Sequence, residues 1–227
     1  MVNLAKYLTN NSNDVALIAR SMVDHFLPNG LPNPNEYDVA TTVLKGDIPE
    51  NYFMEGLETL LKIEKDWIPQ TPGSSLYIRP FIFASGIGFH ASPADEYKFI
   101  IACAPSGPYF AGNVKVLIEE KYSRSANGGV GFAKAGGNYA GQFYPTQLAV
   151  KKGYHQVIWT DDNTHEYIEE AGAMNIFVRI NDTLITSPTS DRILDGITRK
   201  SILQLAEAEG LKTDVRKVKV SELVEAS

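Results

Sequence analysis

The sequence predicts an α+β fold made of two domains. Apolar residues at helical spacing precede Pro69, strand-like alternation begins at Ser75, and a stretch rich in proline and glycine follows at 105–112. Beyond that stretch, strand and helix patterns alternate with turn signals. We therefore expect a smaller domain over 47–106, an interdomain loop over 107–112 and a larger domain over 113–227.

Two helices are expected before the first strand, one over 13–27 and one over about 48–66. Asp47 and Glu50 form a D-x-x-E capping signal for the second helix. Its expected buried face consists of Phe53, Leu57, Leu60 and Leu61. The expected strands are 76–83, 97–104, 114–119, 156–159, 166–168, 175–180 and 183–186, with further helices at 139–152 and 197–209.

The composition favours a folded protein and argues against nucleic-acid-binding and membrane-spanning proteins. The chain has 227 residues, of which 44% are hydrophobic, enough for a sizeable core. A formal net charge of −6 argues against a nucleic-acid partner, and no run approaches the roughly 20 apolar residues of a membrane span. Cys103 is the single cysteine and lies in an apolar run, so we expect it to be buried, in a reducing compartment such as the cytoplasm. The four histidines show no metal-ligand spacing, and no metal is expected.

The first motif that carries chemistry is the segment 128–139, in which Lys134 lies among five glycines and precedes a helix. Glycines let a backbone approach a ligand closely. A desolvated lysine loses its proton readily and can then attack an aldehyde to form an imine. The alternative is a flexible loop with a solvated lysine.

The second motif is a pair of adjacent carboxylates, Glu169 and Glu170, which lead into an apolar strand. Because neighbouring side chains of a strand face opposite ways, one carboxylate can point inward while the other is solvated. A buried carboxylate needs a partner, and a protonated pyridinium nitrogen would serve. The alternative is two exposed acids at a strand end.

Two further motifs predict binding of anions. Gly196, Ile197 and Thr198 open a helix, whose free N–H groups and dipole favour a phosphate, although an ordinary helix cap has the same pattern. Tyr77 and Arg79 are two residues apart and therefore share a face of a strand. The pair can be a receptor for a carboxylate, or simply a surface arginine that lies over an aromatic ring. Together the four motifs supply what pyridoxal 5′-phosphate (PLP) chemistry on an amino acid requires.

In this order, the motifs resemble those of branched-chain amino acid aminotransferases, which are fold-type IV PLP enzymes. The matching stretches are Ser75–Pro80, Gly107–Phe110, Lys134–Tyr139, Glu170–Asn175 and Gly196–Arg199. The resemblance covers roughly 47–227. It implies a PLP site between a small α/β domain and a larger β-rich domain, in a homodimer that acts on small amino acids and 2-oxo acids.

The resemblance also implies roles for single residues. Lys134 would carry PLP and move the proton of the substrate, Tyr139 would contact the phenolic oxygen, and Glu170 would pair with the pyridinium nitrogen. Ile197 and Thr198 would hold the phosphate, and Arg124 is a further cofactor-binding residue. Substrate binding is implied for Tyr77, Arg79, Tyr109, Phe110 and Ala173.

The sequence also departs from the family pattern. Residues 1–46 contain neither the histidine-tyrosine-glycine nor the Phe-Glu-Gly stretch of the family, and the chain ends where the family continues to a Gly-Thr-Ala segment. Three functions therefore stay open. They are transamination of branched-chain L-amino acids with 2-oxoglutarate, another fold-type IV activity (D-amino acid aminotransferase or aminodeoxychorismate lyase), and an inactive, truncated aminotransferase core.

Overall fold

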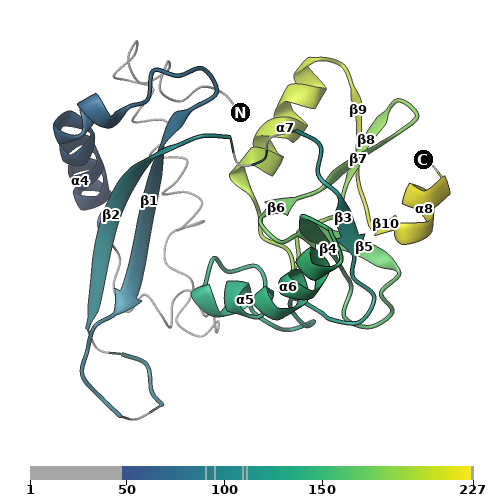
Figure 1. Cartoon of the computed structure of the whole chain (residues 1–227), viewed down its shortest axis with the longest axis horizontal. Helices are drawn as coiled ribbons and strands as arrows, with labels where there is room; N and C mark the ends of the chain where they lie inside the picture. Colours follow the sequence, from purple (N-terminus) through teal and green to yellow (C-terminus); the bar gives the residue numbers. More distant parts are fainter. Residues whose placement is uncertain (1–47, 90, 95, 109, 111, 226–227) are drawn as a thin grey trace. The chain divides into compact units, whose positions relative to one another are not determined.

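The computed structural model of the chain describes residues 48–89, 91–94, 96–108, 110 and 112–225 (Figure 1). The helix expected over 13–27, like all of the N-terminal segment 1–46, lies outside these residues. The chain divides into two compact units, unit 1 (Met1–Ala111) and unit 2 (Gly112–Ser227). The interdomain loop over 107–112 stays a prediction.

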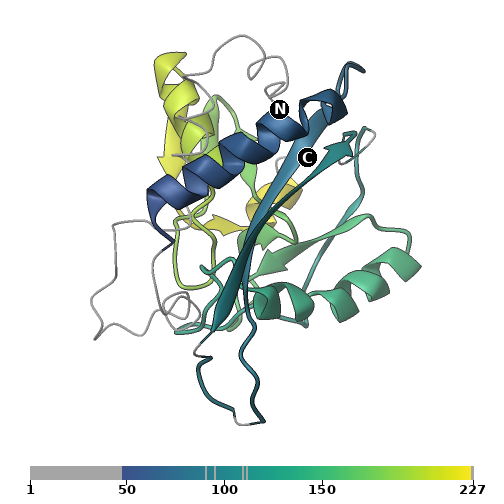
Figure 2. The ribbon, with the colours of Figure 1, turned by 90° about the vertical axis from the view of Figure 1, so that its left-hand side faces the viewer.

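In unit 1, one helix lies along a two-stranded antiparallel sheet (Figure 2). Helix α4 spans Glu50–Ile63 and is followed by a short 3-10 helix, Lys65–Trp67. Strand β1 spans Ser75–Ala84 and pairs along its whole length with β2, Tyr97–Ser106. The strand pair thus extends two residues beyond the expected end at residue 104.

Apolar packing fixes α4 on this sheet. Phe53 and Leu57 are buried on the helix, and they contact Ile78 of β1 and Phe99 and Ile101 of β2. Burying one such side chain contributes about 1.5–3 kcal/mol. Leu60 and Leu61, also expected on the buried face, are half-buried.

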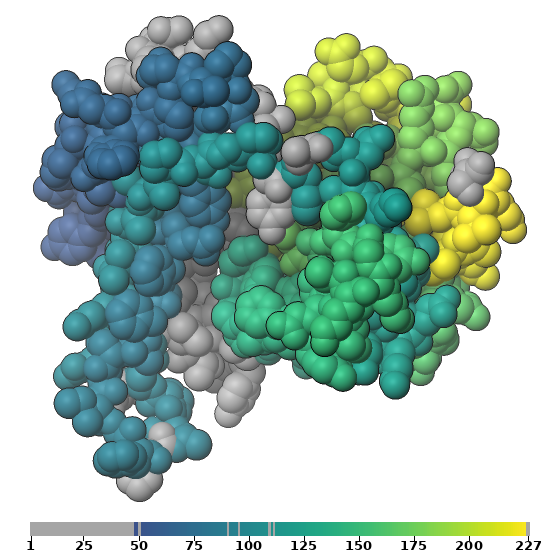
Figure 3. Space-filling model, viewed as in Figure 1, coloured from purple at the N-terminus to yellow at the C-terminus, as the bar shows by residue number. Residues whose placement is uncertain are grey.

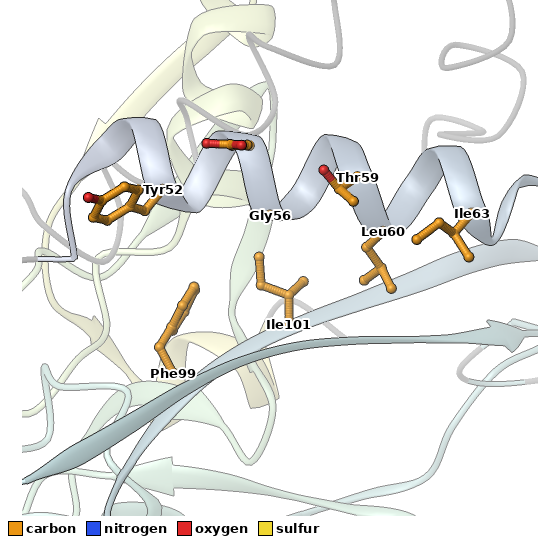
Figure 4. A pocket seen from close by; sticks show the side chains of 8 residues that line it. Tyr52, Gly56, Thr59, Leu60, Ile63, Phe99 and Ile101 are labelled. Carbon is orange, nitrogen blue, oxygen red and sulfur yellow. The ribbon is translucent and has the colours of Figure 1, made fainter.

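Two local expectations in unit 1 are corrected. The N-cap of α4 is Pro49, without a side-chain hydrogen bond, rather than the expected Asp47, which lies outside the described residues. Cys103 is half-buried rather than buried, and it lines a surface pocket together with Trp67. Beside the packed layer, an open groove runs between α4 and β2, lined by Tyr52, Gly56, Ile63 and residues of β2 (Figure 4). None of the predicted site residues lines this groove.

Unit 2 contains two sheets and four helices among its described residues. The first sheet has the strand order β10-β5-β4-β3, with β6 paired to β5, and the second has the order β7-β8-β9. Its strands are β3 (Val116–Ile118), β4 (Gln156–Thr160), β5 (Tyr167–Ala171), β6 (Met174–Asn175), β7 (Phe177–Ile180), β8 (Thr183–Thr186), β9 (Lys212–Val215) and β10 (Val218–Lys219). Its helices are α5 (Gly136–Ala140), α6 (Phe143–Lys151), α7 (Ile197–Ala208) and α8 (Val220–Glu225).

The core of unit 2 lies on both faces of β4. Val157 and Trp159 are fully buried and pack with Ala149 of α6. Ile158, which points the other way, packs with Ile168 of β5 and with residues of β8 and β10. Helices α5 and α6 lie on the surface of the unit, on the face that Figure 3 shows.

The α+β class and the helix expected at 197–209 are confirmed. The single helix expected at 139–152 is wrong, because Gly141 and Gln142 separate α5 from α6. The strand expected at 166–168 is longer, and it includes both Glu169 and Glu170. Within the described residues, we find no helix with the length and hydrophobicity that a bilayer span requires.

Candidate active site

Lys134 lies on the surface of unit 2, directly before helix α5. Its side chain is exposed, and its Nζ donates a hydrogen bond of 2.7 Å to the hydroxyl oxygen of Tyr139. The same nitrogen lies 4.2 Å from the centre of the Tyr139 ring. The structure therefore brings together two of the predicted cofactor-binding residues, with the amine accessible to a small molecule.

Glycines before Lys134 allow its loop to pack closely on other backbone. Gly128 has a φ of +73°, which side chains rarely adopt. A Cβ on Gly131 would lie 2.4 Å from Ser125 Oγ and 2.8 Å from Arg192 Cα. By contrast, a Cβ on Gly136 or Gly137 would meet nothing within 4 Å. The conformation and packing of the loop thus require glycine at the first positions of the motif but not at the last two.

We expect Gly131→Ala to lower the free energy of unfolding by about 1–3 kcal/mol, the usual cost of overpacking. The added methyl group would collide with the backbone of Arg192, which cannot withdraw without disturbing the loop it belongs to. Urea unfolding measures the effect. Gly137→Ala, in open space on α5, is the control and should be neutral or slightly stabilising. Equal stability of both variants would contradict this packing argument.

Glu170 of β5 is a buried carboxylate with two partners. Its Oε1 lies 2.8 Å from Arg124 Nη2, and the side chains of this ion pair are 6% and 2% exposed. The backbone N–H of Leu194 donates to its Oε2 at 3.0 Å. Arg124 also donates to the carbonyl oxygens of Gly131 (3.0 Å) and Arg192, so it connects the loop before Lys134 to the strand of Glu170.

Burial raises the pKa of Glu170 from 4.5 to about 7, although Arg124, the Leu194 N–H and the charge of Lys134 each act to lower it. Desolvation disfavours the ionised form, and here it outweighs the attraction of the guanidinium. Near neutral pH the carboxyl is therefore poised between its two states. A cationic group placed beside it would shift it to the carboxylate.

This pKa predicts a pH dependence of stability. Between pH 4.5 and about 7 the folded chain holds a proton on Glu170 that the unfolded chain has released, so the free energy of unfolding falls as pH rises through this range. The loss amounts to a few kcal/mol at most, at about 1.4 kcal/mol per pKa unit. Urea unfolding of the cofactor-free protein at pH 5, 6 and 7 should show a larger loss for the wild type than for Glu170→Gln, in which only Glu169 keeps a raised pKa on β5. A wild type that gains stability relative to the variant over this range would show that Arg124 keeps the carboxylate ionised.

The neighbouring Glu169 corrects an expectation. The sequence predicted that one of the two glutamates is solvated, but both are buried, Glu169 with 6% of its surface exposed. Glu169 pairs with Arg192, whose guanidinium also contacts Asp162 (3.1 Å) and Asn127 (3.2 Å). Loop segments therefore cover both faces of β5, and each glutamate has its own arginine. Sequence reasoning missed Arg192, which stands in no motif.

The β5–β6 hairpin also holds the start of helix α7. Glu170 and Asn175 are opposite each other in the hairpin, and they bind the two sides of Leu194: its N–H donates to Glu170, while Asn175 Nδ2 donates to its carbonyl oxygen at 2.8 Å. Gly196, the N-cap of α7, approaches so closely that a Cβ there would lie 2.1 Å from Asn175 Oδ1. The sequence placed Asn175 in the matching stretch that begins at Glu170, but it did not predict this contact with the start of α7.

Ile197 and Thr198 form the first turn of α7. Their backbone N–H groups have no partner within a helix, because the first turn has no preceding carbonyls. The Thr198 side chain is exposed. The hydrogen bonds to Leu194 thus place a helix N-terminus, suited to an anion, on the same hairpin that carries Glu170.

Ala173 lies in the two-residue turn between β5 and β6, and it is exposed. The other turn residue, Gly172, packs against two side-chain amides: a Cβ there would lie 2.5 Å from Gln156 Oε1 and 3.0 Å from Gln142 Oε1. Gln142 follows α5, so the turn of Ala173 is held next to the segment that carries Tyr139.

Unit 1 contains the other predicted substrate-binding residues. Arg79 Nη2 donates to the hydroxyl oxygen of Tyr77 at 3.0 Å, and both side chains lie on the exposed face of β1. The arginine is also 5.0 Å from the centre of the tyrosine ring. Phe110 is half-buried, and Tyr109 lies outside the described residues.

Comparison with known proteins agrees with the motifs. The family model "Amino-transferase class IV" matches residues 39–227. A probable branched-chain-amino-acid aminotransferase of Staphylococcus epidermidis is 43% identical over 184 residues, and the match covers 79% of this chain and 51% of the relative. Branched-chain-amino-acid aminotransferase 2 of Bacillus subtilis is 41% identical over 182 residues, covering 79% of this chain and 50% of the relative. The chain spans about half the length of the curated relatives it matches.

Solved structures show the same fold. The branched-chain amino acid aminotransferase of Thermobaculum terrenum in its PLP form has a TM-score of 0.67 at 17% identity, and the match covers 92% of this chain and 62% of that one. The branched-chain amino acid aminotransferase of Escherichia coli has a TM-score of 0.64 at 24% identity, covering 93% and 60%. These similarities confirm the predicted fold-type IV class.

Proposed function

Because the chain belongs to the amino-transferase class IV family, we propose that it transfers the amino group of branched-chain L-amino acids (leucine, isoleucine and valine) to 2-oxoglutarate. The products are the branched-chain 2-oxo acids and glutamate, and the cofactor is PLP. The names of the relatives, at 41% and 43% identity, support the substrate class.

One observation carries the proposal. In unit 2, the exposed amine of Lys134 interacts electrostatically with Glu170 and lowers its pKa. The pKa of this buried carboxyl is nevertheless about 7, so a further cationic partner would shift it to the carboxylate. Arg124 alone does not keep this carboxyl fully ionised near neutral pH, because desolvation outweighs the attraction of the guanidinium. The pyridinium nitrogen of PLP is a partner of the required charge.

The other residues of unit 2 fit PLP as well. The turn that opens α7 offers the N–H groups of Ile197 and Thr198 and the Thr198 hydroxyl to a phosphate. Gly129 and Gly131 let the loop before Lys134 pack closely on the backbone of Ala126 and Arg192, which places the lysine. Arg124, predicted as a further cofactor-binding residue, would act in this proposal by fixing the carboxylate of Glu170.

When bound, PLP supplies an electron sink for the charge that develops at the substrate Cα. In this proposal Lys134 Nζ would hold the cofactor and, once the amino acid has replaced it there, would move the proton at the substrate Cα. The Tyr139 hydroxyl, which accepts a hydrogen bond from Nζ, would donate its own hydrogen to the phenolic oxygen of the cofactor. Glu170 would accept a hydrogen bond from the pyridinium nitrogen.

Each predicted substrate-binding residue offers a group that suits an amino acid in this proposal. Arg79, already aligned by the Tyr77 hydroxyl, offers a guanidinium to a carboxylate. Ala173 offers its backbone at the exposed β5–β6 turn, and Tyr109 and Phe110 contribute aromatic contacts for apolar side chains. We propose a homodimer as the assembly, on the resemblance to the family.

Spectroscopy tests the proposal directly. The purified protein is incubated with PLP, freed of excess cofactor by gel filtration, and given leucine and then 2-oxoglutarate. We expect a retained PLP absorption band that leucine converts to that of pyridoxamine phosphate and that 2-oxoglutarate restores. D-Alanine serves as the control substrate, and a response to it in place of leucine would favour a D-amino acid aminotransferase. A folded protein that retains no band would support an inactive core.

A further inference from the structure

Asn138 makes the contacts that join the loop of Lys134 to the helix of Tyr139. This half-buried residue lies on α5, and its Nδ2 donates to two backbone carbonyl oxygens, those of Val130 and Ala133, the latter at 2.8 Å. Ala133 directly precedes Lys134. One side-chain amide therefore uses both of its hydrogens to hold two carbonyl groups of the loop, one of which belongs to the peptide group that joins Ala133 to Lys134.

Helix α5 itself has few features that fix it on this loop. Helix α5 has five residues, and its N-cap, Ala135, makes no side-chain hydrogen bond. A single helical turn has little stability of its own. A Cβ on Gly136 or Gly137 would touch nothing, so side-chain packing does not hold the turn there either. The amide of Asn138 thus ties α5 to the backbone of the loop before it, beside the hydrogen bond from the Lys134 side chain to Tyr139.

We propose that Asn138 is a positioning residue for Lys134. By holding the carbonyl groups of Val130 and Ala133, it fixes the direction in which the Lys134 side chain leaves the backbone. It also fixes the next residue along the helix, Tyr139, whose hydroxyl oxygen accepts the hydrogen bond from Nζ. This inference rests on the proposed function, in which Nζ must reach the cofactor.

The chemistry of the side chain suggests two variants. Asn138→Ala removes both hydrogen bonds. Asn138→Asp keeps the shape but replaces the donor by a carboxylate oxygen, which repels the two carbonyl oxygens. Asn51→Asp adds the same charge at an exposed position of α4 and is the matched control.

The first measurement needs no cofactor. Hydrogen–deuterium exchange of peptides spanning 128–139 is compared in the cofactor-free wild type and variants. We expect about tenfold faster exchange in both Asn138 variants and no change in Asn51→Asp, with peptides of β4 unchanged in all. Unchanged exchange of the 128–139 peptides would overturn the inference, whatever the protein binds.

The second measurement separates positioning from a general structural role. Binding of PLP, which Lys134 can hold covalently, is compared with binding of pyridoxamine 5′-phosphate, which has no aldehyde. We expect PLP capture to weaken about tenfold or more in the variants, while the affinity for pyridoxamine 5′-phosphate stays within about twofold. Equal losses for both ligands would overturn positioning in favour of a structural role. A wild type that binds neither ligand would refute the proposed function, and the exchange experiment would still decide whether Asn138 fixes the loop.

Discussion

Lys134→Ala will not retain PLP after gel filtration, and its conversion of leucine will fall by at least about 10²–10⁴-fold, the usual contribution of a positioned proton-transfer group. The expected loss is large because one nitrogen has two tasks in the proposal: it holds the cofactor and moves the proton. The alanine side chain is a methyl group without an amine, so the variant can neither hold the cofactor nor move the proton. The absorption spectrum and the rate of the leucine reaction measure them separately.

Lys152→Ala is the control for this experiment. Lys152 is also exposed in unit 2, at the C-cap of α6, and we expect its variant to behave as the wild type. A second lysine, Lys200, lies near the start of α7 but is engaged by Asp195 at 2.8 Å. If Lys134→Ala kept its leucine reaction within tenfold of the wild type, Lys200 would become the candidate amine.

The residues with proposed chemical roles are visible in the sequence because each has a side chain that the proposed chemistry requires. Lys134 among glycines, Glu170 before a strand and Thr198 at a helix start are visible as types and spacings. The structure then adds contacts among them, such as the hydrogen bond from Lys134 to Tyr139. These contacts agree with the spacing but do not follow from it.

What the sequence did not reveal depends on segments far apart in the chain. Alternation along β5 correctly placed Glu169 and Glu170 on opposite faces, but it gave no sign that the 190–194 segment covers the side of Glu169. Arg192, 23 residues away, turns an expected surface acid into half of a buried ion pair. Strand β9 was missed because Lys212, Thr213 and Asp214 give it no apolar alternation; its parallel pairing with β8 determines its structure.

The buried pairs of β5 lead to the second large effect that we expect. Glu170→Gln will retain PLP on Lys134, because the amine and the phosphate site are intact, but its leucine reaction will slow by about 10–100-fold. An amide cannot balance the charge of a pyridinium, and a charge-assisted hydrogen bond is worth about 1.5–3 kcal/mol, at about 1.4 kcal/mol per tenfold in rate. Rapid-mixing absorbance with leucine measures the rate at fixed cofactor occupancy.

Glu169→Gln is the matched control, because it alters the adjacent residue of the same strand and also breaks a buried pair with an arginine. Asp162 remains as a partner of Arg192, so the variant should lose about 1–3 kcal/mol of unfolding free energy while its leucine reaction stays within a few-fold of the wild type. If both variants slowed the reaction equally, damage to β5 would explain the loss, and Glu170 would have no role at the ring nitrogen. A slow reaction in Glu170→Gln alone can arise only from what Glu170 faces and Glu169 does not: Arg124, Leu194 and the proposed cofactor.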